Sequence, residues 1–545
     1  MPRRLLAFFL AAAAPATLGA AAMPPEEPRL VLQLTIDQLR GDRLPKYREK
    51  FGAGGFQRLL ERGVWFTAAH HDAANTLTAS GHAVLATGAA TGEHGIVAND
   101  WYDRATARMT YCVADARFPV IGEPAKPGVG VSPALLLAAT IGDEIVASGP
   151  GRRAFAVAGK DRSAVIPGGQ RGQAYWFSES IGGFTTSTFY RSTLPAWLEA
   201  WNGTKAFAAY QALTWTPLRT TTVAANPHAR PAGSLGRTFP HPLLAKSDAL
   251  FLAAFPYTPF FDELTLGFTR ELITAEKIGR TGGLDYLSVS LSSTDYIGHA
   301  YGPESPEAED NLLRLDANLA DFFRFLDDAV GLDHVLIVLS ADHGSADIPE
   351  ASRARGLAAG RIQPAEVLAQ VNALLRRSLG VETDLVRAFV PPGFYLDLPR
   401  VAAAKLTPAA VQAALAAAAR QLPGIAYAFE HVRLARGEVP ATPLGERVRR
   451  AFHPARSGDV VIVQEKLWYL YPEAERYAAM HGSPYDYDTH VPVILCGPGI
   501  AAQVIREPAS PAQIVPTLAA LLGCRTPAGA RSPSLLPLLQ PRPGN

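Results

Sequence analysis

The sequence predicts an α/β fold in which helices cover both faces of a mostly parallel sheet. Three apolar runs of strand length support this prediction: Leu30–Ile36, residues 284–291 ("LDYLSVSL") and Val335–Leu339. Near-continuous apolar runs of this length indicate strands that are buried on both faces. Helical patterns lie between the runs, and the order strand, helix, strand is typical of parallel sheets.

The clearest helical pattern lies in residues 304–330, "ESPEAEDNLLRLDANLADFFRFLDDAV". Its apolar side chains recur at intervals that place them on one face of a helix. They are Leu312, Leu315, Leu319, Phe322, Phe323 and Leu326. A second stretch, "NTLTASGHAVLATG" at residues 75–88, has the pattern of a loop that enters a helix, with small residues that allow close approach.

We expect one folded domain over residues 23–545, and two regions within it have the composition of insertions. Residues near 170–259 are rich in Thr, Trp, Tyr, Pro and Gly with weak periodicity, which predicts a loop-rich elaboration. Residues near 361–460 alternate strand-like and helical pieces, such as "TPAAVQAALAAAARQL", and predict a small α+β lid.

The first 22 residues have the features of a signal peptide. Arg3 and Arg4 form a basic region, and an apolar run at residues 5–14 is too short to span a membrane. Small residues at 20–22 fit an Ala-x-Ala cleavage site, so the mature chain is expected to begin near Met23. We therefore expect a periplasmic or secreted protein, and no later segment has the length and apolar character of a transmembrane anchor.

Composition and charge exclude some classes of protein. The 545 residues are 48% hydrophobic and carry 51 basic against 50 acidic side chains, a formal charge of +1. This balance gives no electrostatic basis for binding nucleic acid or an anionic membrane surface. The three cysteines, Cys112, Cys496 and Cys524, permit one disulfide or none, and their spacing does not fit a thiolate metal site.

An aspartate follows each of the three predicted strands: Asp37, Asp295 and Asp342. Open α/β sheets bind ligands beyond the carboxyl ends of their strands, so the three carboxylates can converge on one rim of the sheet. A single aspartate after a strand is more often a turn or helix-capping residue. Three of them, two with a histidine close by, favour a common site.

Those two histidines are His299 and His343. Asp295 and His299 are four residues apart, so one helical turn places both on one side, while His343 directly follows Asp342. A mixed set of carboxylate and imidazole ligands suits zinc or a similar divalent ion and is too rich in nitrogen for calcium.

A second metal ion requires another histidine, and "MHGSPYDYDTHVPVILCGPG" contains two. We favour His481, which precedes a glycine-containing loop that can reach the rim. His490 directly adjoins the strand expected at residues 491–495. Two ions about 4 Å apart would hold both the attacking and the leaving oxygen of a displaced phosphoryl group.

Residues 75–88 also contain hydroxyl groups that are candidates for a nucleophile: Thr76, Thr78 and Ser80. Metal coordination activates a hydroxyl for attack, and the free N–H groups at the start of a helix favour anions. The alternative is that a threonine here only caps the helix. The residues alone leave all three hydroxyls open.

Seven motifs resemble those of the alkaline phosphatase superfamily, in the same order along the chain. They are "TIDQLRGD", "NTLTASGHAVLATG", "HGIVAND", "GKDRSA", "STDYIGHAYGP", "SADHG" and "HGSPYDYDTHVP", and they extend from Thr35 to Pro492. The chain is most similar to the threonine-nucleophile branch, the phosphate-irrepressible and Sphingomonas-type alkaline phosphatases. The resemblance implies a zinc-dependent phosphate monoester hydrolase of broad substrate range, with an alkaline-phosphatase-like core, two Zn²⁺ ions and a phosphothreonine intermediate.

The resemblance also implies a role for each matching residue. Thr78, in Thr-x-x-Gly-His, matches the nucleophile, and Asn99, in "VAND", matches a donor to a phosphoryl oxygen. The remaining oxygens are implied to contact Lys160 and Arg162 of "GKDR". The ligands of one zinc match Asp37, Thr78, Asp342 and His343, and those of the other match Asp295, His299 and His481.

The basic pair bears on the choice of substrate. Lys160 and Arg162 are two residues apart, and we expect their side chains to share one face of an extended segment. Arginine suits forked contacts to phosphate, and lysine acts as a compact charge. The phosphodiesterase and nucleotide pyrophosphatase branch lacks this pair, so the resemblance implies a preference for monoesters.

We therefore expect small phosphate monoesters as the partners of a monomeric enzyme. A phosphodiesterase or nucleotide pyrophosphatase of the same superfamily is the first alternative. A non-catalytic binding protein that keeps the fold is the second.

Overall fold

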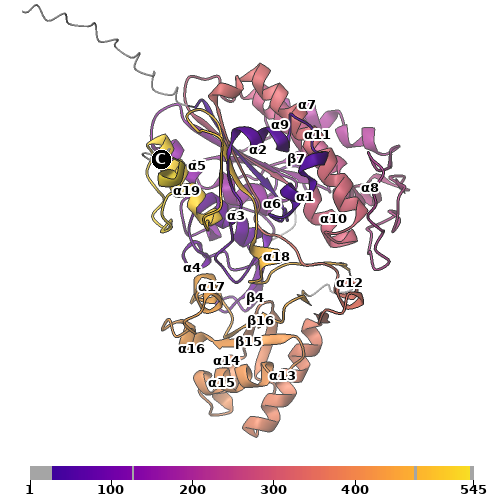
Figure 1. Cartoon of the computed structure of the whole chain (residues 1–545). Helices are drawn as coiled ribbons and strands as arrows, with labels where there is room; N and C mark the ends of the chain where they lie inside the picture. The colour runs from indigo at the N-terminus through magenta and orange to yellow at the C-terminus, as the bar shows by residue number, and fades with distance from the viewer. Residues whose placement is uncertain (1–27, 125–127, 472–475, 540–545) are drawn as a thin grey trace, which may run out of the picture.

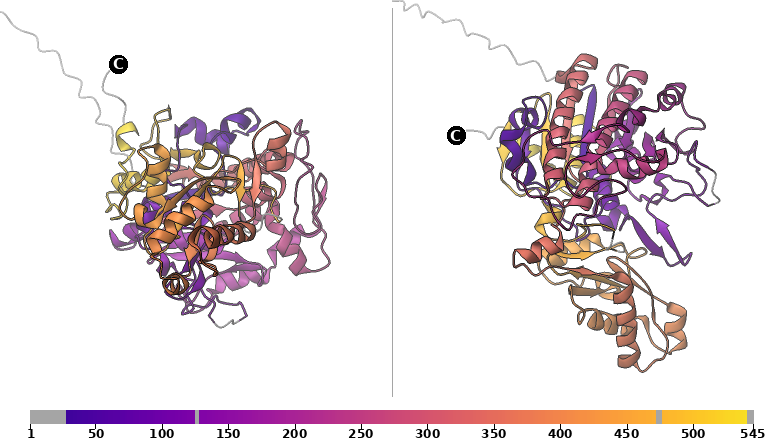
Figure 2. Two further views of the ribbon diagram at one scale, coloured as in Figure 1. Left: turned by 90° about the horizontal axis from the view of Figure 1, so that it is seen from below. Right: turned by 90° about the vertical axis from the view of Figure 1, so that its right-hand side faces the viewer.

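The computed structural model describes residues 28–124, 128–471 and 476–539, and Figures 1 and 2 show their arrangement. The predicted signal peptide, residues 1–22, lies outside the described residues. Within those ranges, no helix combines the length and the apolar character that crossing a membrane requires. All three cysteines are free thiols, so none of them forms a disulfide.

Among the described residues, nine strands form a central sheet in the order β19-β2-β18-β11-β1-β10-β5-β6-β7. Their bounds are β1 Leu30–Ile36, β2 Val64–Phe66, β5 Arg153–Ala158, β6 Gln173–Ser178, β7 Gly183–Thr185, β10 Asp285–Leu291, β11 Val335–Ser340, β18 Val493–Cys496 and β19 Gln503–Ile505. β11, β1, β10, β5 and β6 are parallel, whereas β18 and β7 are antiparallel to β11 and β6. The prediction of an α/β fold with a mostly parallel sheet is confirmed.

β1 shows why the apolar runs are nearly continuous. Its side chains at 30, 32, 34 and 36 belong to an apolar cluster shared with α9 (Phe260–Ala275) and α11 (Pro306–Ala329). On the opposite face, Val31 packs in a second cluster with α5 (Ile141–Ala147) and α19 (Ile514–Leu522). Figure 1 shows these two pairs of helices on opposite sides of the sheet. Both faces of the strand are therefore covered, as the sequence pattern predicts.

The long helical pattern at residues 304–330 forms α11. Ser305 caps its first turn by accepting a hydrogen bond from the backbone N–H of Ala308 at 3.1 Å, and Pro306 occupies the first helical position. The predicted apolar face is buried against the sheet: Leu312, Leu315, Leu319, Phe322, Phe323 and Leu326.

The two regions with an insertion-like composition differ in structure. Residues 170–259 include β6 and β7, so the predicted insertion does not lie wholly outside the central sheet. Most of residues 361–460 surround a separate four-stranded antiparallel sheet, ordered β13-β14-β16-β15. These strands are β13 Val386–Val390, β14 Gly393–Leu396, β15 Ile425–Glu430 and β16 Val460–Gln464, and they pack against α13 (Pro364–Leu379) and α15 (Pro408–Ala419). We call this unit the small sheet.

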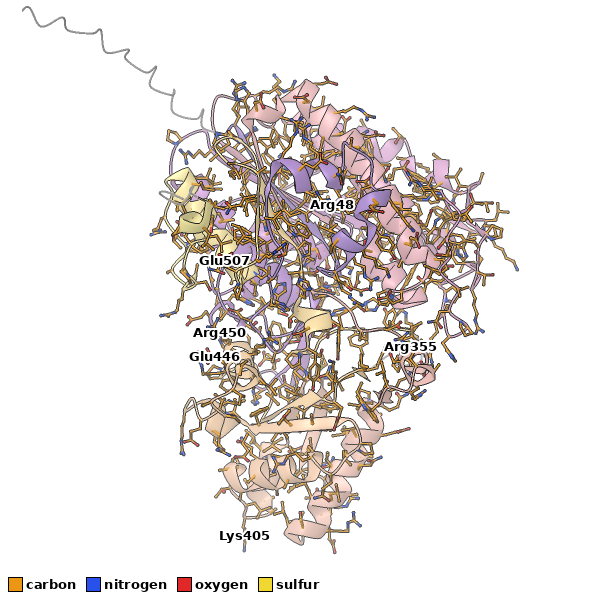
Figure 3. The ribbon with its side chains drawn as sticks, viewed as in Figure 1. Arg48, Arg355, Lys405, Glu446, Arg450 and Glu507 are labelled. Atoms are coloured by element: carbon orange, nitrogen blue, oxygen red, sulfur yellow. The ribbon has the colours of Figure 1, made fainter. Side chains whose placement is uncertain are left out.

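The small sheet lies at one end of the molecule, below the central sheet in Figure 1, and α17 (Pro443–Ala451) lies at the boundary between the two. Arg450 of α17 forms ion pairs with Glu446 on the same helix and with Asp72 of the core. Figure 3 shows Arg450 and Glu446 together at this junction. The backbone N–H of Ala74 donates to the carbonyl of Arg447 at 3.0 Å, so α17 holds the segment that leads into residues 75–88.

Candidate active site

Three adjacent strands bring the predicted acidic residues together. β11, β1 and β10 are neighbours in the sheet, and their carboxyl ends lie on one rim. Asp37 follows β1, Asp342 follows β11, and Asp295 lies in the first turn of α10 (Ser293–Tyr301), just after β10. Two buried groups result, and the ligand atoms within each lie within 4.8 Å of one another. Their members are Asp37, Asp342 and His343 in one, and Asp295, His299 and His481 in the other.

The structure distinguishes the two histidines that the sequence left as alternatives. His481 Nε2 lies 3.6 Å from Asp295 Oδ1, and its ring stacks on that of His343 with the centroids 3.5 Å apart. His490 stacks instead on His70, and its Nε2 lies 2.9 Å from the carbonyl oxygen of Thr67. The favoured histidine thus lies where the two groups meet, and His490 lies outside both.

The three histidines of these groups are oriented in the same way. Each places Nδ1 against a backbone carbonyl oxygen, which accepts a hydrogen bond and therefore fixes the proton on Nδ1. The pairs are His299 with Ala479 at 2.8 Å, His343 with Gly344 at 2.9 Å and His481 with Thr76 at 2.7 Å. Each Nε2 consequently presents its lone pair to the carboxylates. Burial lowers the pKa of His343 and His481, which keeps both rings neutral and able to bind a metal.

The charges in the site favour additional cations. Burial raises the pKa of Asp37 well above its ordinary value, and the nearby carboxylates of Asp295 and Asp342 raise it further. One ammonium faces them: Lys160 Nζ lies 2.6 Å from Asp37 and 2.5 Å from Asp295. Burial opposes its charge, but these two carboxylates raise the pKa of Lys160.

One ammonium does not balance three buried carboxylates. Moreover, Asp37 Oδ1 is buried and accepts no hydrogen bond from any residue in the described ranges. Carboxylate oxygens and neutral imidazoles are ligands of divalent metals, so the residues present fit such ions at both groups.

The structure also separates the three candidate hydroxyls. Thr76 donates to the carbonyl of Ser483 at 2.9 Å, and Ser80 donates to the carbonyls of Asn75 and Leu77. Thr78 begins α3 (Thr78–Thr87), and its Oγ1 lies 3.4 Å from His343 Nε2. Of the three, Thr78 is therefore the hydroxyl placed against a predicted metal ligand.

Of the three predicted phosphoryl-binding residues, Asn99 contacts this helix start, Lys160 contacts the carboxylates and Arg162 contacts Tyr111. Asn99 Oδ1 accepts a hydrogen bond from the N–H of Ala79 at 3.0 Å, which leaves its amide N–H groups to donate. The expectation that Lys160 and Arg162 share an extended segment is wrong, because α6 (Asp161–Gly168) begins between them. Lys160 occupies the position just before that helix, and Arg162 lies in its first turn, with Nη1 3.4 Å from the phenol oxygen of Tyr111.

Residues 31–484 match the family of type I phosphodiesterases / nucleotide pyrophosphatases, a range that includes every site residue named above. The chain belongs to this family. It is thereby a member of the alkaline phosphatase superfamily, and the assignment made from the seven motifs is confirmed.

Two curated relatives and one solved structure place the chain more narrowly in the superfamily. Alkaline phosphatase PafA of Elizabethkingia meningoseptica is 33% identical over 512 residues, 92% of this chain and 93% of that protein. Alkaline phosphatase PhoV of Synechococcus elongatus is 32% identical over 526 residues, 94% of this chain and 93% of that protein. The crystal structure of wild-type PafA aligns with a TM-score of 0.88 at 31% identity, over 95% of this chain and 100% of that one.

Sequence reasoning missed Gln38, a residue that joins the two ligand groups. Its backbone N–H donates to Asp342 at 3.2 Å and its side-chain amide donates to Asp295 at 2.7 Å. Gln38 adopts a left-handed φ of 69°, which turns the chain sharply after β1. Gly298 of α10 makes room for it, because a Cβ there would lie 1.9 Å from Gln38 Oε1. In the sequence, the feature of Gln38 that could have indicated this role is its position directly after Asp37.

His82 is a second residue that was missed, although it belongs to the quoted Thr-x-x-Gly-His motif. It lies one turn after Thr78 in α3, with Nδ1 2.9 Å from the carbonyl oxygen of Thr78 and 3.0 Å from Asp342 Oδ2, and with Nε2 2.8 Å from Ser290 Oγ. Gly81 permits this approach, since a Cβ there would lie 2.2 Å from the carbonyl oxygen of Asp342. His82 therefore packs directly against the carboxylate of a predicted metal ligand.

Asp488 supports the loop that carries His481. It lies in α18 (Asp486–Thr489), and one carboxylate oxygen accepts hydrogen bonds from Ser483 N at 2.8 Å and Ser483 Oγ at 2.6 Å. The carbonyl of Ser483 in turn accepts from Thr76, whose own carbonyl orients His481. Burial raises the pKa of Asp488 to about 7.

This raised pKa predicts a pH-dependent contribution to stability. The folded chain keeps the Asp488 proton up to about pH 7, whereas the unfolded chain releases it near pH 4. The stabilisation is therefore complete below about pH 4 and is lost as the pH rises to about 7, by up to about 4 kcal/mol. Asp488→Asn imitates the protonated acid and should be more stable than the wild type at pH 8, with a difference that vanishes near pH 4. Urea unfolding at both pH values measures this; a difference independent of pH would contradict it.

Proposed function

We propose that the protein is an alkaline phosphatase that hydrolyses phosphate monoesters through a phosphothreonine intermediate on Thr78. The observation that carries the proposal is the position of the Thr78 hydroxyl. It lies at the start of α3, buried and beside His343, a member of the ligand group that also contains Asp37 and Asp342. The similarity to the alkaline phosphatases PafA and PhoV over more than nine-tenths of the chain supports the same activity.

The proposed cofactors are two Zn²⁺ ions, for which the mixed carboxylate and imidazole donors are suited. One would be held by Asp37, Thr78, Asp342 and His343, and the other by Asp295, His299 and His481. When bound, such ions lower the pKa of a coordinated hydroxyl and neutralise charge on the attacking and leaving oxygens.

The chain's own residues supply the remaining parts of the reaction. Thr78 Oγ1 forms a bond to phosphorus as the ester P–O bond breaks, and the proton of Thr78 ends on the departing alcohol. Asn99 donates to a phosphoryl oxygen, while Lys160 and Arg162 attract the others. A water molecule then cleaves the phosphothreonine, which releases inorganic phosphate and restores the Thr78 hydroxyl.

We further propose a broad range of small monoesters, a monomeric protein of one domain over residues 23–545, and export through residues 1–22. The basic n-region, the apolar run and the Ala-x-Ala site support export. N-terminal sequencing of protein recovered outside the cytoplasm should give a start near Met23.

The substrate class is tested with an aryl phosphate and its methyl ester, which share one leaving group. We expect the monoester to have the higher kcat/KM, because a second ester group removes a charged oxygen that Lys160 and Arg162 attract. Preference for the diester would instead favour a phosphodiesterase. The absence of turnover and of bound metal would favour a binding protein.

Arg162→Ala should lower kcat/KM for the monoester by about 10- to 100-fold, since one charged donor to the transition state is removed. The diester should be affected less, so the ratio of the two rates should fall. Arg171→Ala is a suitable control because Arg171 follows the same helix at an exposed position. An equal loss on both esters would contradict a role for Arg162 in selecting monoesters.

A further inference from the structure

A pocket opens beside the predicted ligand His481 and the predicted phosphoryl donor Asn99, between the core and the small sheet. It has about 210 Å³ of free space. His481 belongs to the ligand group of Asp295 and His299, and not to the group next to Thr78. In the proposed mechanism the ion held by this group would neutralise charge on the leaving oxygen, so a pocket beside His481 lies within reach of the departing alcohol.

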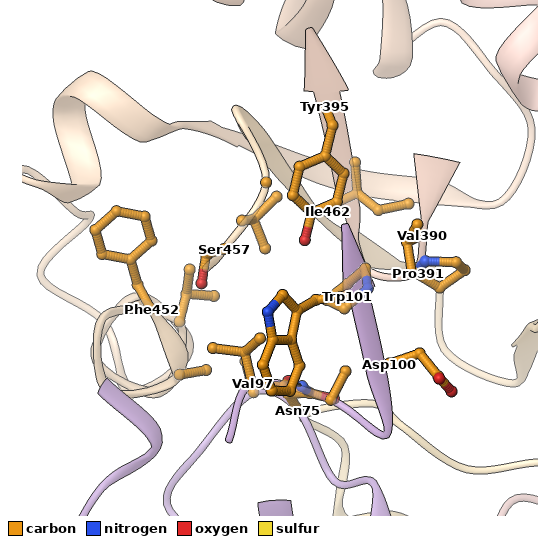
Figure 4. Close-up of a pocket in the computed structure, with 18 residues that line it drawn as sticks. Asn75, Val97, Asp100, Trp101, Val390, Pro391, Tyr395, Phe452, Ser457 and Ile462 are labelled. Atoms are coloured by element: carbon orange, nitrogen blue, oxygen red, sulfur yellow. Dashed lines mark hydrogen bonds between the residues drawn. The ribbon is translucent and has the colours of Figure 1, made fainter. Parts of the chain in front are cut away.

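The wall of this pocket is mostly apolar. Its apolar lining includes Leu77, Met109, Val390, Pro391, Pro392 and Leu470. These residues come from both parts of the molecule. Met109 extends from the core strand β4 (Arg108–Tyr111), and Val390 and the two prolines follow β13 of the small sheet. Figure 4 shows Val390 and Pro391 across from Asp100 and Trp101 of the core.

A second, inner crevice continues from the pocket and shares Asn75, Asp100 and Val390 to Pro392 with it. Trp101, Tyr395 and Phe452 line the crevice (Figure 4). It has only about 30 Å³ of free space, which is room for about two water molecules. The crevice is therefore packed contact between the two parts, and the outer pocket is where a ligand group fits.

We infer that the outer pocket is a subsite for the leaving group and that it selects phosphate esters of apolar alcohols. The inference rests on the proposed phosphatase activity. A chain or ring attached to the leaving oxygen would contact Met109, Val390 and Pro391 and be removed from water. Asp100, at the same pocket, adds a negative charge that disfavours leaving groups with a carboxylate or further phosphates.

A series of unbranched alkyl phosphates tests the inference, because the leaving alcohols from ethyl to hexyl differ little in chemical reactivity. We expect kcat/KM to rise with chain length, by up to about fourfold for each methylene that enters the pocket. Equal kcat/KM values for ethyl and hexyl phosphate would contradict the proposed subsite but not the proposed phosphatase activity. If no ester in the series releases phosphate, the proposed function itself fails.

Variants at Met109 assign the effect to the pocket. Met109 is 53% exposed, so Met109→Gln preserves the length of the side chain with little risk to folding. We expect it to lower the hexyl-to-ethyl ratio of kcat/KM by about threefold or more, the worth of roughly one methylene contact. Val129 is equally exposed, at 53%, and lies outside the pocket lining. Val129→Gln should keep the wild-type ratio, and the same decrease in both variants would overturn the assignment.

Discussion

Thr78→Ala is expected to reduce the turnover of phosphate monoesters by at least about 10³-fold, because it removes the oxygen that attacks phosphorus. The fold should be retained. Alanine is a good helix former at the start of α3, and the 3.4 Å contact to His343 is the hydrogen bond that the Thr78 hydroxyl makes within the described chain. Steady-state kinetics with an aryl phosphate and a thermal unfolding curve measure the two properties.

Ser80→Ala provides the matched control two residues away. The Ser80 hydroxyl donates to backbone carbonyls, so its removal should leave turnover within a few-fold of the wild type. Mass spectrometry of protein quenched in acid during turnover should locate a phosphoryl group on Thr78. A phosphoryl group on Ser80, or near-wild-type turnover by Thr78→Ala, would contradict the proposed nucleophile.

Removal of divalent metal with a chelator should abolish turnover and lower the unfolding temperature. Bound ions stabilise the folded state, by about 4 kcal/mol for an ion present at 1,000 times its dissociation constant. Without them, the buried carboxylates of Asp37 and Asp295 share one ammonium, that of Lys160, which also attracts Asp342. Metal analysis of the purified protein should give two zinc ions per chain, and added Zn²⁺ should restore turnover.

The two neighbouring histidines give this experiment a matched pair of variants. His481→Ala removes a predicted ligand, and we expect it to bind one zinc ion and to lose turnover. His490→Ala should bind two, because His490 stacks on His70 away from both groups. Full activity of chelated, metal-free protein would refute the metal requirement, and two zinc ions in His481→Ala would refute the ligand assignment.

The features predicted well from sequence depend on local pattern and on one general rule. The apolar run at residues 30–36 forms β1 with the same bounds, and the helical spacing at 304–330 forms α11. The meeting of Asp37, Asp295 and Asp342 follows from the rule that ligands bind at the carboxyl ends of parallel strands. The position of each aspartate after the apolar run of its predicted strand was enough to predict that the three carboxylates meet.

The features that were missed depend on contacts between distant segments. Gln38 and Asp488 carry no signature of their own, and their importance lies in partners that only the folded chain brings near. The order of β6 and β7 in the sheet is likewise set by tertiary pairing. The error at Arg162 had a local cause, because the spacing of a charged pair does not show where a strand ends and a helix begins.

The orientation of the three site histidines has an evolutionary consequence. Their Nδ1 atoms are held by main-chain carbonyls of residues 76, 344 and 479, and every amino acid supplies such a carbonyl. Mutation at residues 76 and 479 therefore keeps the acceptor as long as the path of the chain is preserved, whereas at Gly344 a Cβ would lie 2.2 Å from the carbonyl oxygen of Tyr487. The orientation of His299 thus depends on the path of the chain at residue 479 rather than on its side chain, whereas the orientation of His343 also requires a glycine at residue 344.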